Sequence, residues 1–305
     1  MREISILLAS YNGAAFLPAQ LDSIAAQSHS TWRLIVSDDG STDDTPDVIR
    51  RFAASRPAGQ VELVEGPRAG ATTNFRGLLR REGAGGRVLA FADQDDVWTA
   101  DHLARGLALL EGQTGPTITG ARMRYVDTGL QPRGLSPLPR RDLCFRNALV
   151  QNVLSGNTMM LNPAAAHLLH KAEARAPEFP LHDWWAYQMV TGAGGAALYD
   201  PLPNLLYRQH GGNVVGANRG AASLLPRLRR YLGGGYTALA RQNLAALNAA
   251  ADLLSPENRT RLQDFSAALE APWPQNLPLM RRSGVFYQSR KAQAAFQLLL
   301  ASGRI

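Results

Sequence analysis

The chain has few cysteines, few lysines and no long apolar run, and each shortage excludes a class of protein. Its single cysteine, Cys144, cannot form an intramolecular disulfide, which is typical of a reducing compartment. No apolar run approaches the roughly 18 residues that a membrane-spanning helix needs. The first apolar run, residues 4–9, is too short for the core of a signal peptide, so we interpret it as a strand. We therefore expect a cytoplasmic protein.

Lysine supplies only two of the 32 basic residues, and acidic residues are scarce in one region alone. Residues 1–220 hold 21 basic and 21 acidic side chains, whereas residues 221–305 hold 11 and 4. The whole net charge of +7 therefore lies in the tail. Because the sequence contains no recognisable nucleic-acid-binding motif, we expect no nucleic-acid partner despite this charge.

The tail, residues 221–305, mixes leucines with cations. The residues that carry this pattern are Leu224, Leu225, Leu228, Tyr231 and Leu232 beside Arg227, Arg229 and Arg230, and a second group of Arg281, Arg282, Arg290 and Lys291. The pattern is typical of an amphipathic helix on an anionic membrane surface, here the inner face of the plasma membrane. It is equally typical of a helical dimerisation region, so peripheral membrane contact and a homodimer both stay open.

The first 111 residues repeat a strand and a helix four times. Short apolar runs at 4–9, 32–36, 61–64 and 88–92 are each followed by apolar residues at helical spacing. This alternation predicts an α/β fold with a mostly parallel, doubly wound sheet, whose ligands bind beyond the carboxyl ends of the strands. Past residue 111 we expect short strands at 196–199 and 204–207 and a loop at 128–142. Residues 1–220 would form this domain, and residues 221–305 a C-terminal helical extension.

Polar residues follow three of the expected strands. The first strand ends in Ser10-Tyr11-Asn12-Gly13, the second in residues 38–43, and the fourth in Asp93-Gln94-Asp95-Asp96. Three carboxylates within four residues repel one another unless something positive meets them, and a hard divalent cation is the usual solution. The alternative is a solvated turn before a helix, where acids are also favourable. Convergence of three polar loops at one sheet edge favours the cation.

These three motifs occur in the order and at about the spacing seen in family 2 glycosyltransferases, which the sequence resembles over roughly residues 1–216. The resemblance implies the GT-A fold and inverting transfer from a nucleotide-sugar donor. Residues 93–98, 182–185 and 208–216 are similar to the bacterial rhamnosyltransferase-like branch, which implies dTDP-rhamnose or a UDP-sugar as donor and cell-surface polysaccharide synthesis as the process. The Gln-x-x-Arg-Trp motif of processive members is absent, which favours transfer of a single sugar.

The resemblance also assigns roles to residues. Residues that match the nucleotide-sugar site are Ser10, Tyr11, Asn12, Asp38, Asp39, Asp93 and Asp95, and Arg208 is expected to contact phosphate there. Asp95, with Asp93 close by, would hold Mg²⁺ or Mn²⁺, and Asp96 would support them. His210 would complete the metal shell or contact the pyrophosphate; the alternative is a hydrogen-bonded loop histidine.

Inversion needs a base for the acceptor hydroxyl. Family members usually supply it from an acidic pair at a helix start, and here the matching place is His182-Asp183, so we predict Asp183 as the base. The alternatives are that Asp183 caps its helix or that His182 is the base. The acceptor, a glycan or a lipid-linked sugar, would meet Gly156, Asn157 and Trp184, although Trp184 or Trp185 could instead pack in the core.

Three other classes of protein compete with this interpretation. A nucleotidyltransferase would carry a glycine-rich first loop that ends in Arg and a Lys for the triphosphate, but the first loop here is Ser10-Tyr11-Asn12-Gly13. A dehydrogenase would need Gly-x-Gly-x-x-Gly after the first strand, which is absent. An inactive nucleotide-sugar-binding scaffold is disfavoured because Asp93, Asp95 and Asp183 are all present.

Overall fold

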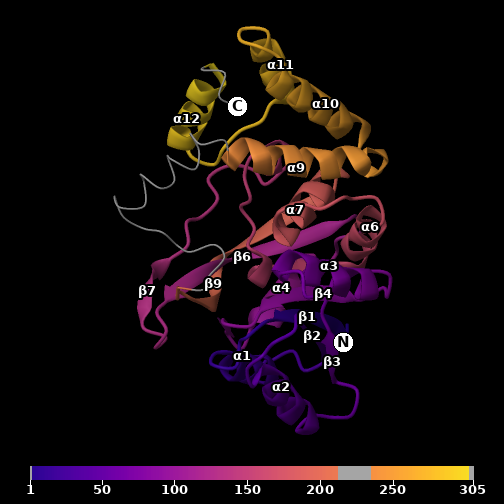
Figure 1. Cartoon of the computed structure of the whole chain (residues 1–305), viewed down its shortest axis with the longest axis vertical. Helices are drawn as coiled ribbons and strands as arrows, with labels where there is room; N and C mark the ends of the chain where they lie inside the picture. The colour runs from indigo at the N-terminus through magenta and orange to yellow at the C-terminus, as the bar shows by residue number, and fades with distance from the viewer. Residues whose placement is uncertain (1, 212–234, 302–305) are drawn as a thin grey trace.

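The computed structural model describes residues 2–211 and 235–301 (Figure 1). The expected domain boundary at residue 220, residues 212–216 of the glycine-rich loop and the leucine–arginine segment 224–232 lie outside the described residues. Within them, no helix combines the length and apolar character that crossing a bilayer requires.

The sheet has nine strands, and its first half is parallel, as predicted. The strands are β1 (Ile4–Ser10), β2 (Trp32–Asp38), β3 (Val61–Glu65), β4 (Val88–Asp93), β5 (Val97–Trp98), β6 (Thr117–Val126), β7 (Pro132–Leu135), β8 (Met160–Leu161) and β9 (Ala196–Arg208). Their order is β3-β2-β1-β4-β8-β6-β9-β5, with β7 paired to β6. Strands β1 to β4 run parallel, β8 is antiparallel to β4 and β6, and β9 runs parallel to β6.

Helices cover both faces of this sheet. They are α1 (Leu17–Ala25), α2 (Thr45–Ala54), α3 (Ala71–Glu82), α4 (His102–Leu110), α5 (Phe145–Ala148), α6 (Pro163–Glu173) and α7 (His182–Gly192). Because successive strand residues point to opposite faces, Ile6 and Leu8 pack with α1, α2 and α4, whereas Leu7 packs with α3, α6 and α7. Burial on both faces explains why β1, β2 and β4 are continuous apolar runs in the sequence.

The second half of the sheet departs from the expectations in two places. Residues 128–142 are not all loop, because β7 forms a hairpin with β6. The two short strands expected at 196–199 and 204–207 are one 13-residue strand, β9, whose register with β6 shifts opposite Asp200 and Pro203. Bulges of this kind accommodate proline within a strand. Pro201 and Pro203 therefore interrupt the apolar pattern of the sequence but not the strand itself.

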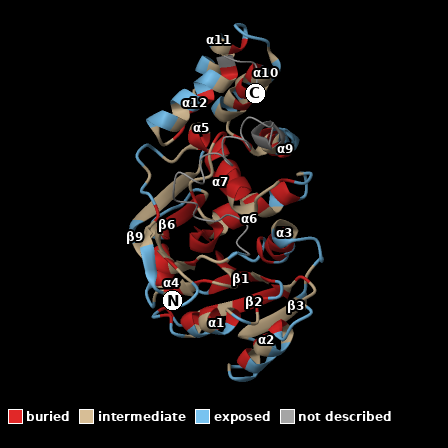
Figure 2. Cartoon of the chain, turned by 60° about the vertical axis from the view of Figure 1, so that its left-hand side comes forward, coloured by how far each residue is buried: buried red, intermediate tan, exposed pale blue. Residues whose placement is uncertain are grey.

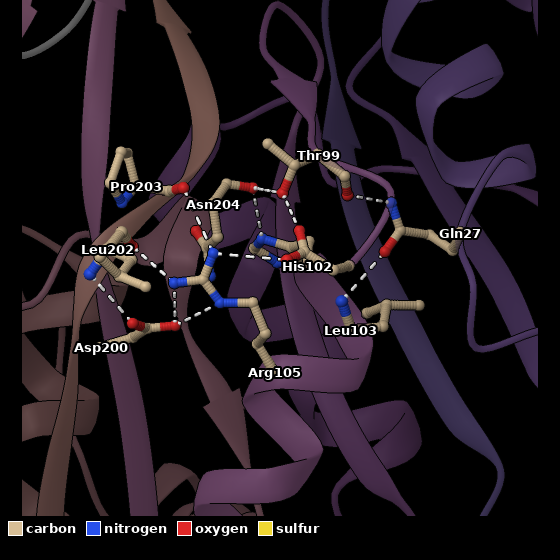
Figure 3. A network of polar contacts seen from close by, with 10 residues as sticks. Gln27, Thr99, His102, Leu103, Arg105, Asp200, Leu202, Pro203 and Asn204 are labelled. Atoms are coloured by element: carbon tan, nitrogen blue, oxygen red, sulfur yellow. Dashed lines mark hydrogen bonds and ion pairs between the residues drawn. The ribbon is translucent and has the colours of Figure 1, made fainter.

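A polar network fastens this irregular part of β9 to α4 (Figure 3). Arg105 donates to Asp200 Oδ2 from Nε at 2.8 Å and to the carbonyl oxygen of Leu202 from Nη2 at 2.9 Å. His102 contacts the carbonyl oxygen of Asn204 through Nδ1 at 3.3 Å. The Asn204 carbonyl also accepts from the Thr99 N–H at 3.0 Å. Together these contacts hold the strand that leads to Arg208.

The C-terminal helices continue the same hydrophobic core. They are α9 (Gly235–Ala249), α10 (Pro256–Glu270), α11 (Asn276–Ser283) and α12 (Arg290–Ala301). Leu247 and Phe265 belong to the cluster that also contains Trp185 of α7. Asn258 Nδ2 donates to the carbonyl oxygens of Thr191 and Gly192, both at 3.1 Å. Helices α9 and α10 therefore pack on α7 (Figure 1).

Candidate active site

The register of the parallel strands brings the three polar strand ends together. Ser10 of β1 lies opposite Asp38 of β2, and Ala9 lies opposite Asp93 of β4. The carboxyl ends of adjacent parallel strands share one edge, and the expected convergence is confirmed.

The loop after β1 is fastened to the loop after β2. Asn12 has the left-handed conformation, with φ of 46°, which asparagine tolerates better than most residues. Its backbone N–H donates to Ser41 Oγ at 2.8 Å, and its side-chain oxygen accepts from the Thr42 N–H at 2.8 Å. Asp38 accepts from the hydroxyls of Ser10 and Ser41, at 3.0 and 2.6 Å. The two loops therefore form one rigid surface.

Asp39 has a different environment from Asp38. It is buried, and its carboxylate accepts from the backbone N–H groups of Arg68 at 2.6 Å and Gly70 at 2.7 Å. The side chain thus orders the loop that precedes α3. Its expected contact with the nucleotide stays a prediction, and so does that of Asp38.

Gln94, which had no role in the sequence-based interpretation, connects the acidic motif to the first loop. Its Oε1 accepts from the Tyr11 N–H at 2.9 Å, and its Nε2 donates to the Tyr11 carbonyl at 3.0 Å. Gly13 leaves room for this contact, because a Cβ there would overlap Gln94 Oε1. Gln94 therefore fixes the backbone of Tyr11, whose ring is 55% exposed.

The acidic motif forms a compact cluster. Oxygen atoms of Asp93, Asp95 and Asp96 all lie within 4.8 Å of one another. Burial, together with the charges of Asp95 and Asp183, raises the pKa of Asp93 to about 8. Burial and repulsion from Asp93 and Asp95 also raise the pKa of Asp96 well above its usual value, against hydrogen bonds from Asn157 and Arg208 that lower it. Without a cation, these raised pKa values favour protonated carboxyl groups, and a positive ion would be needed to keep the cluster ionised.

This donor set fits a hard divalent cation, which prefers carboxylate oxygens. Asp93 and Asp95 are partly accessible, whereas Asp96 is fully buried and hydrogen-bonded to the Asn157 side chain and the Arg208 N–H. That placement agrees with the supporting role expected for Asp96. His210 Nε2 lies 2.7 Å from Asp95 Oδ2, and its ring stacks on Phe16 with centroids 4.8 Å apart. His210 therefore touches the cluster, and direct metal ligation by it stays a prediction.

Arg208 is buried beneath the cluster. Its Nε donates to the Asp95 carbonyl at 2.9 Å, its Nη1 donates to the Thr128 carbonyl, and its guanidinium lies 4.9 Å from the centroid of the Phe16 ring. These contacts order the backbone of the acidic motif. The expected phosphate contact of Arg208 stays a prediction.

Asp183 lies in the first turn of α7. Its Oδ2 accepts from the Gly156 N–H at 3.2 Å and its Oδ1 from the Trp184 N–H at 2.7 Å. The residue before the helix is Leu181, and no side chain caps this helix end. The charge of Asp183 contributes to the raised pKa of Asp93, so the two carboxyl groups lie near each other. Asp183 also satisfies a first-turn N–H of α7, and its role as the base rather than a cap stays a prediction.

His182 is enclosed by aromatic rings. It stacks on Phe75 with centroids 3.9 Å apart and meets the edge of Phe91 at 5.1 Å. Burial lowers the pKa of His182 to about 4, although Asp183 raises it. The imidazole is therefore neutral at neutral pH, and its Nε2 is buried without a hydrogen-bond partner. The choice of Asp183 over His182 as the base stays a prediction.

The residues expected to meet the acceptor are buried. Asn157 bonds to Asp96 and accepts from Ser155 Oγ, and Trp184 donates its indole N–H to the Ala148 carbonyl at 2.7 Å. Trp185 stacks on Phe179 in the core. Gly156 permits close packing, because a Cβ there would lie 2.7 Å from His182 Nε2. Contact of Gly156, Asn157 and Trp184 with an acceptor stays a prediction.

The fold and this cluster define a glycosyltransferase of the GT-A class. The chain belongs to glycosyl transferase family 2, whose family model matches residues 5–169. The dTDP-rhamnosyl transferase RfbG of Shigella flexneri is 26% identical over 226 residues, which cover 69% of this chain and 74% of RfbG. An Escherichia coli enzyme, UDP-Glc:alpha-D-GlcNAc-diphosphoundecaprenol beta-1,3-glucosyltransferase WfgD, is 31% identical over 107 residues, which cover 35% of this chain and 40% of WfgD.

Solved structures show the same fold. TarS 1–349 of S. aureus in complex with UDP-GlcNAc superimposes with a TM-score of 0.56 at 16% identity, and the match covers 93% of each chain. The mannosyltransferase PcManGT of Pyrobaculum calidifontis, in complex with GDP-Man and Mn2+, gives a TM-score of 0.53 at 19% identity and covers 99% of this chain and 85% of that one. The predicted family and fold are therefore confirmed.

Proposed function

We propose that this glycosyltransferase transfers a single rhamnose from dTDP-rhamnose, with inversion, to a hydroxyl group of a glycan or lipid-linked acceptor in cell-surface polysaccharide synthesis. The name of the relative RfbG supports the donor, with a UDP-sugar as the alternative, and that of WfgD supports a lipid-linked acceptor. Such an acceptor also favours a peripheral location at a membrane.

The observation that carries the proposal is the acidic cluster with Asp183 beside it. Asp93 and Asp95 would hold Mg²⁺ or Mn²⁺, and the complex of PcManGT with GDP-Man and Mn2+ supports this assignment. When bound, the ion acts as a Lewis acid that offsets charge on the departing diphosphate. His210, bonded to Asp95 Oδ2, orients that carboxylate or adds a further ligand.

The protein's own groups complete the reaction. Asp183 receives the proton of the acceptor hydroxyl on a carboxylate oxygen, while its two backbone hydrogen bonds keep the group in place. On the donor side, Tyr11 presents an exposed ring, and Ser10, Asn12, Asp38 and Asp39 order the loops around the nucleotide. Gly156 and the buried Asn157 and Trp184 shape the acceptor side.

Donor binding is tested by thermal unfolding with dTDP-rhamnose, UDP-glucose or GDP-mannose in the presence of Mn²⁺. At 100 times its Kd, the true donor should add about 2.7 kcal/mol to the free energy of unfolding. Asp95→Asn should abolish the part of this gain that depends on Mn²⁺, whereas Asp22→Asn, a matched change at an exposed position of α1, should not. If no nucleotide sugar stabilises the protein, the proposal is wrong.

Catalysis is separated from binding by Asp183→Asn. This variant should bind the donor as tightly as the unchanged protein but lose transfer to an acceptor, because the amide cannot take up the proton. A variant that transfers sugar at the original rate would exclude Asp183 as the base. If the unchanged protein binds the donor but neither hydrolyses it nor transfers its sugar, it is a binding scaffold.

A further inference from the structure

The end of the chain contains cations but no acids. The last acidic residue is Glu270, and residues 271–305 carry four arginines and Lys291. Of these, Arg281, Arg290 and Lys291 are exposed, whereas Arg282 pairs with Asp264 at 3.0 Å. The charged side chains of this segment are therefore all positive, and its acidic neighbours are Asp264 and the exposed Glu270 of α10.

Exposed apolar side chains lie among these cations. Leu298 of α12 is 72% exposed, and Arg290, Ala294 and Leu298 follow one another at a spacing of four residues, so they share one face of the helix. Lys291 and Ala295 are exposed beside them. Figure 2 shows exposed stretches on the outer sides of α11 and α12.

Trp273 belongs to the same end of the molecule. It is 57% exposed and lies just before α11. Asn276 Nδ2, at the start of α11, donates to the carbonyl oxygen of Leu300 at 3.4 Å, which connects this end to the last turn of α12. We call Trp273, Arg281, Arg290, Lys291 and Leu298 the tail patch.

Two further arginines adjoin the start of α12. The backbone N–H groups of Arg140 and Arg141 both donate to Gln288 Oε1 at 2.8 Å, two residues before Arg290. Both arginines are exposed, and so are Leu138 and the acid Asp142 in the same segment. The positive surface thus extends beyond the tail itself.

From this geometry we propose that the tail patch docks on an anionic lipid bilayer. Tryptophan is favoured at the boundary between headgroups and acyl chains, because its ring is apolar and its N–H can stay hydrated. Arginine and lysine beside it gain roughly 1 kcal/mol each at an anionic surface. A bilayer supplies both the negative charge that these cations attract and the apolar layer that Trp273 and Leu298 can enter. This docking rests on the function proposed above and names the surface by which the enzyme would reach a lipid-linked acceptor.

Trp273 provides a fluorescent probe within the tail patch itself. All five tryptophans lie in the described part of the chain, and the other four, Trp32, Trp98, Trp184 and Trp185, are at most 7% exposed. Vesicles of phosphatidylcholine with phosphatidylglycerol should shift the fluorescence of the full-length protein to shorter wavelength, and brominated lipid should quench it. Vesicles of phosphatidylcholine alone should do neither. Trp273→Phe should remove both responses.

Charge variants distinguish docking through the tail patch from nonspecific electrostatic attraction between the whole protein and the vesicles. Arg290→Gln with Lys291→Gln should weaken co-sedimentation with the anionic vesicles roughly 30-fold. The matched control, Arg50→Gln with Arg51→Gln, makes the same charge change on exposed residues of α2, at the other end of the molecule (Figure 1), and should leave co-sedimentation nearly unchanged.

Three results would overturn the docking proposal: no response of Trp273 to anionic vesicles, equal loss in both double variants, or a stable dimer in solution that shields Trp273 from a soluble quencher. Donor-induced thermal stabilisation without vesicles reports the proposed function independently. If the protein binds the donor but not anionic vesicles, only the docking proposal is wrong. If it binds anionic vesicles but no donor, the proposed function is wrong and the lipid-binding surface remains.

Discussion

The contact between Gln94 and the first loop allows a quantitative test of how the donor site is built. Gly13→Ala would place a methyl group where Gln94 Oε1 now lies. The Gly13 backbone does not have a positive φ, so alanine is compatible with the chain conformation. The substitution should therefore act through Gln94, which must leave Tyr11, rather than through backbone strain.

The expected size follows from the two hydrogen bonds that Gln94 makes with Tyr11. Each contributes about 0.5–1.5 kcal/mol net, and the lower half applies because water can replace them at this exposed place. Gln94→Ala should cost about 1–2 kcal/mol of stability, and Gly13→Ala should cost the same loss less the roughly 0.4–1 kcal/mol that alanine gains by restricting the unfolded chain. The double variant should cost no more than Gln94→Ala alone, because the overlap is gone and alanine restricts the unfolded chain by about 0.4–1 kcal/mol. The two sites should therefore couple by about 1–2 kcal/mol.

The assay is chemical unfolding of the four proteins, together with donor titration of each. Donor affinity should fall in both single variants, because Tyr11 loses its support. In the double variant it should be no worse than in Gln94→Ala. Additive losses, with the double variant costing the sum of both, would refute the idea that Gly13 is small in order to accommodate Gln94.

Three further predictions concern the acceptor side, pH and the acidic motif. Gly156→Ala should lower kcat roughly 100-fold with donor affinity unchanged, because its Cβ displaces His182 and the adjacent Asp183; turnover within threefold would contradict this. Burial lowers the pKa of His102 and of His182 to about 4. The unfolded chain takes up protons near pH 6.5, so the free energy of unfolding should fall by up to roughly 3 kcal/mol per histidine between pH 6.5 and 4, as measured by denaturant titration, and His182→Phe should remove its share. Arg208→Lys should weaken Mn²⁺ binding in calorimetry, because lysine cannot bridge the Asp95 and Thr128 carbonyls over Phe16; unchanged affinity would exclude this supporting role.

The first half of the fold was predictable because β1, β2 and β4 are buried on both faces. Such strands are short apolar runs, and all three lie where those runs lie. The edge strand β3 is only partly buried, but it too lies at its expected run. The second half was harder because proline breaks the pattern without breaking the strand. Pro132 begins β7, and Pro203 lies in the irregular part of β9, whose carbonyl groups Arg105 and His102 contact from α4.

The candidate site likewise contains residues that the sequence predicts and residues that it does not. Residues with chemistry of their own, such as Asp93, Asp95 and Asp183, stood out from their types and their positions at element ends. Gln94 and Phe16 did not, since their roles consist entirely of contacts with segments far along the chain. A glutamine between acids and a phenylalanine at a helix start carry no signal until the sheet brings those segments together.

The electrostatics of the acidic motif explain why these supporting contacts are numerous. The pKa values of Asp93 and Asp96 are raised, so nearby cations do not offset their charges, although Arg208 is adjacent. Its guanidinium donates to main-chain carbonyls of Asp95 and Thr128. Without a cation, the raised pKa values favour protonation of Asp93 and Asp96. A divalent cation at this sheet edge would displace those protons, so its binding should release protons and stabilise the folded protein directly.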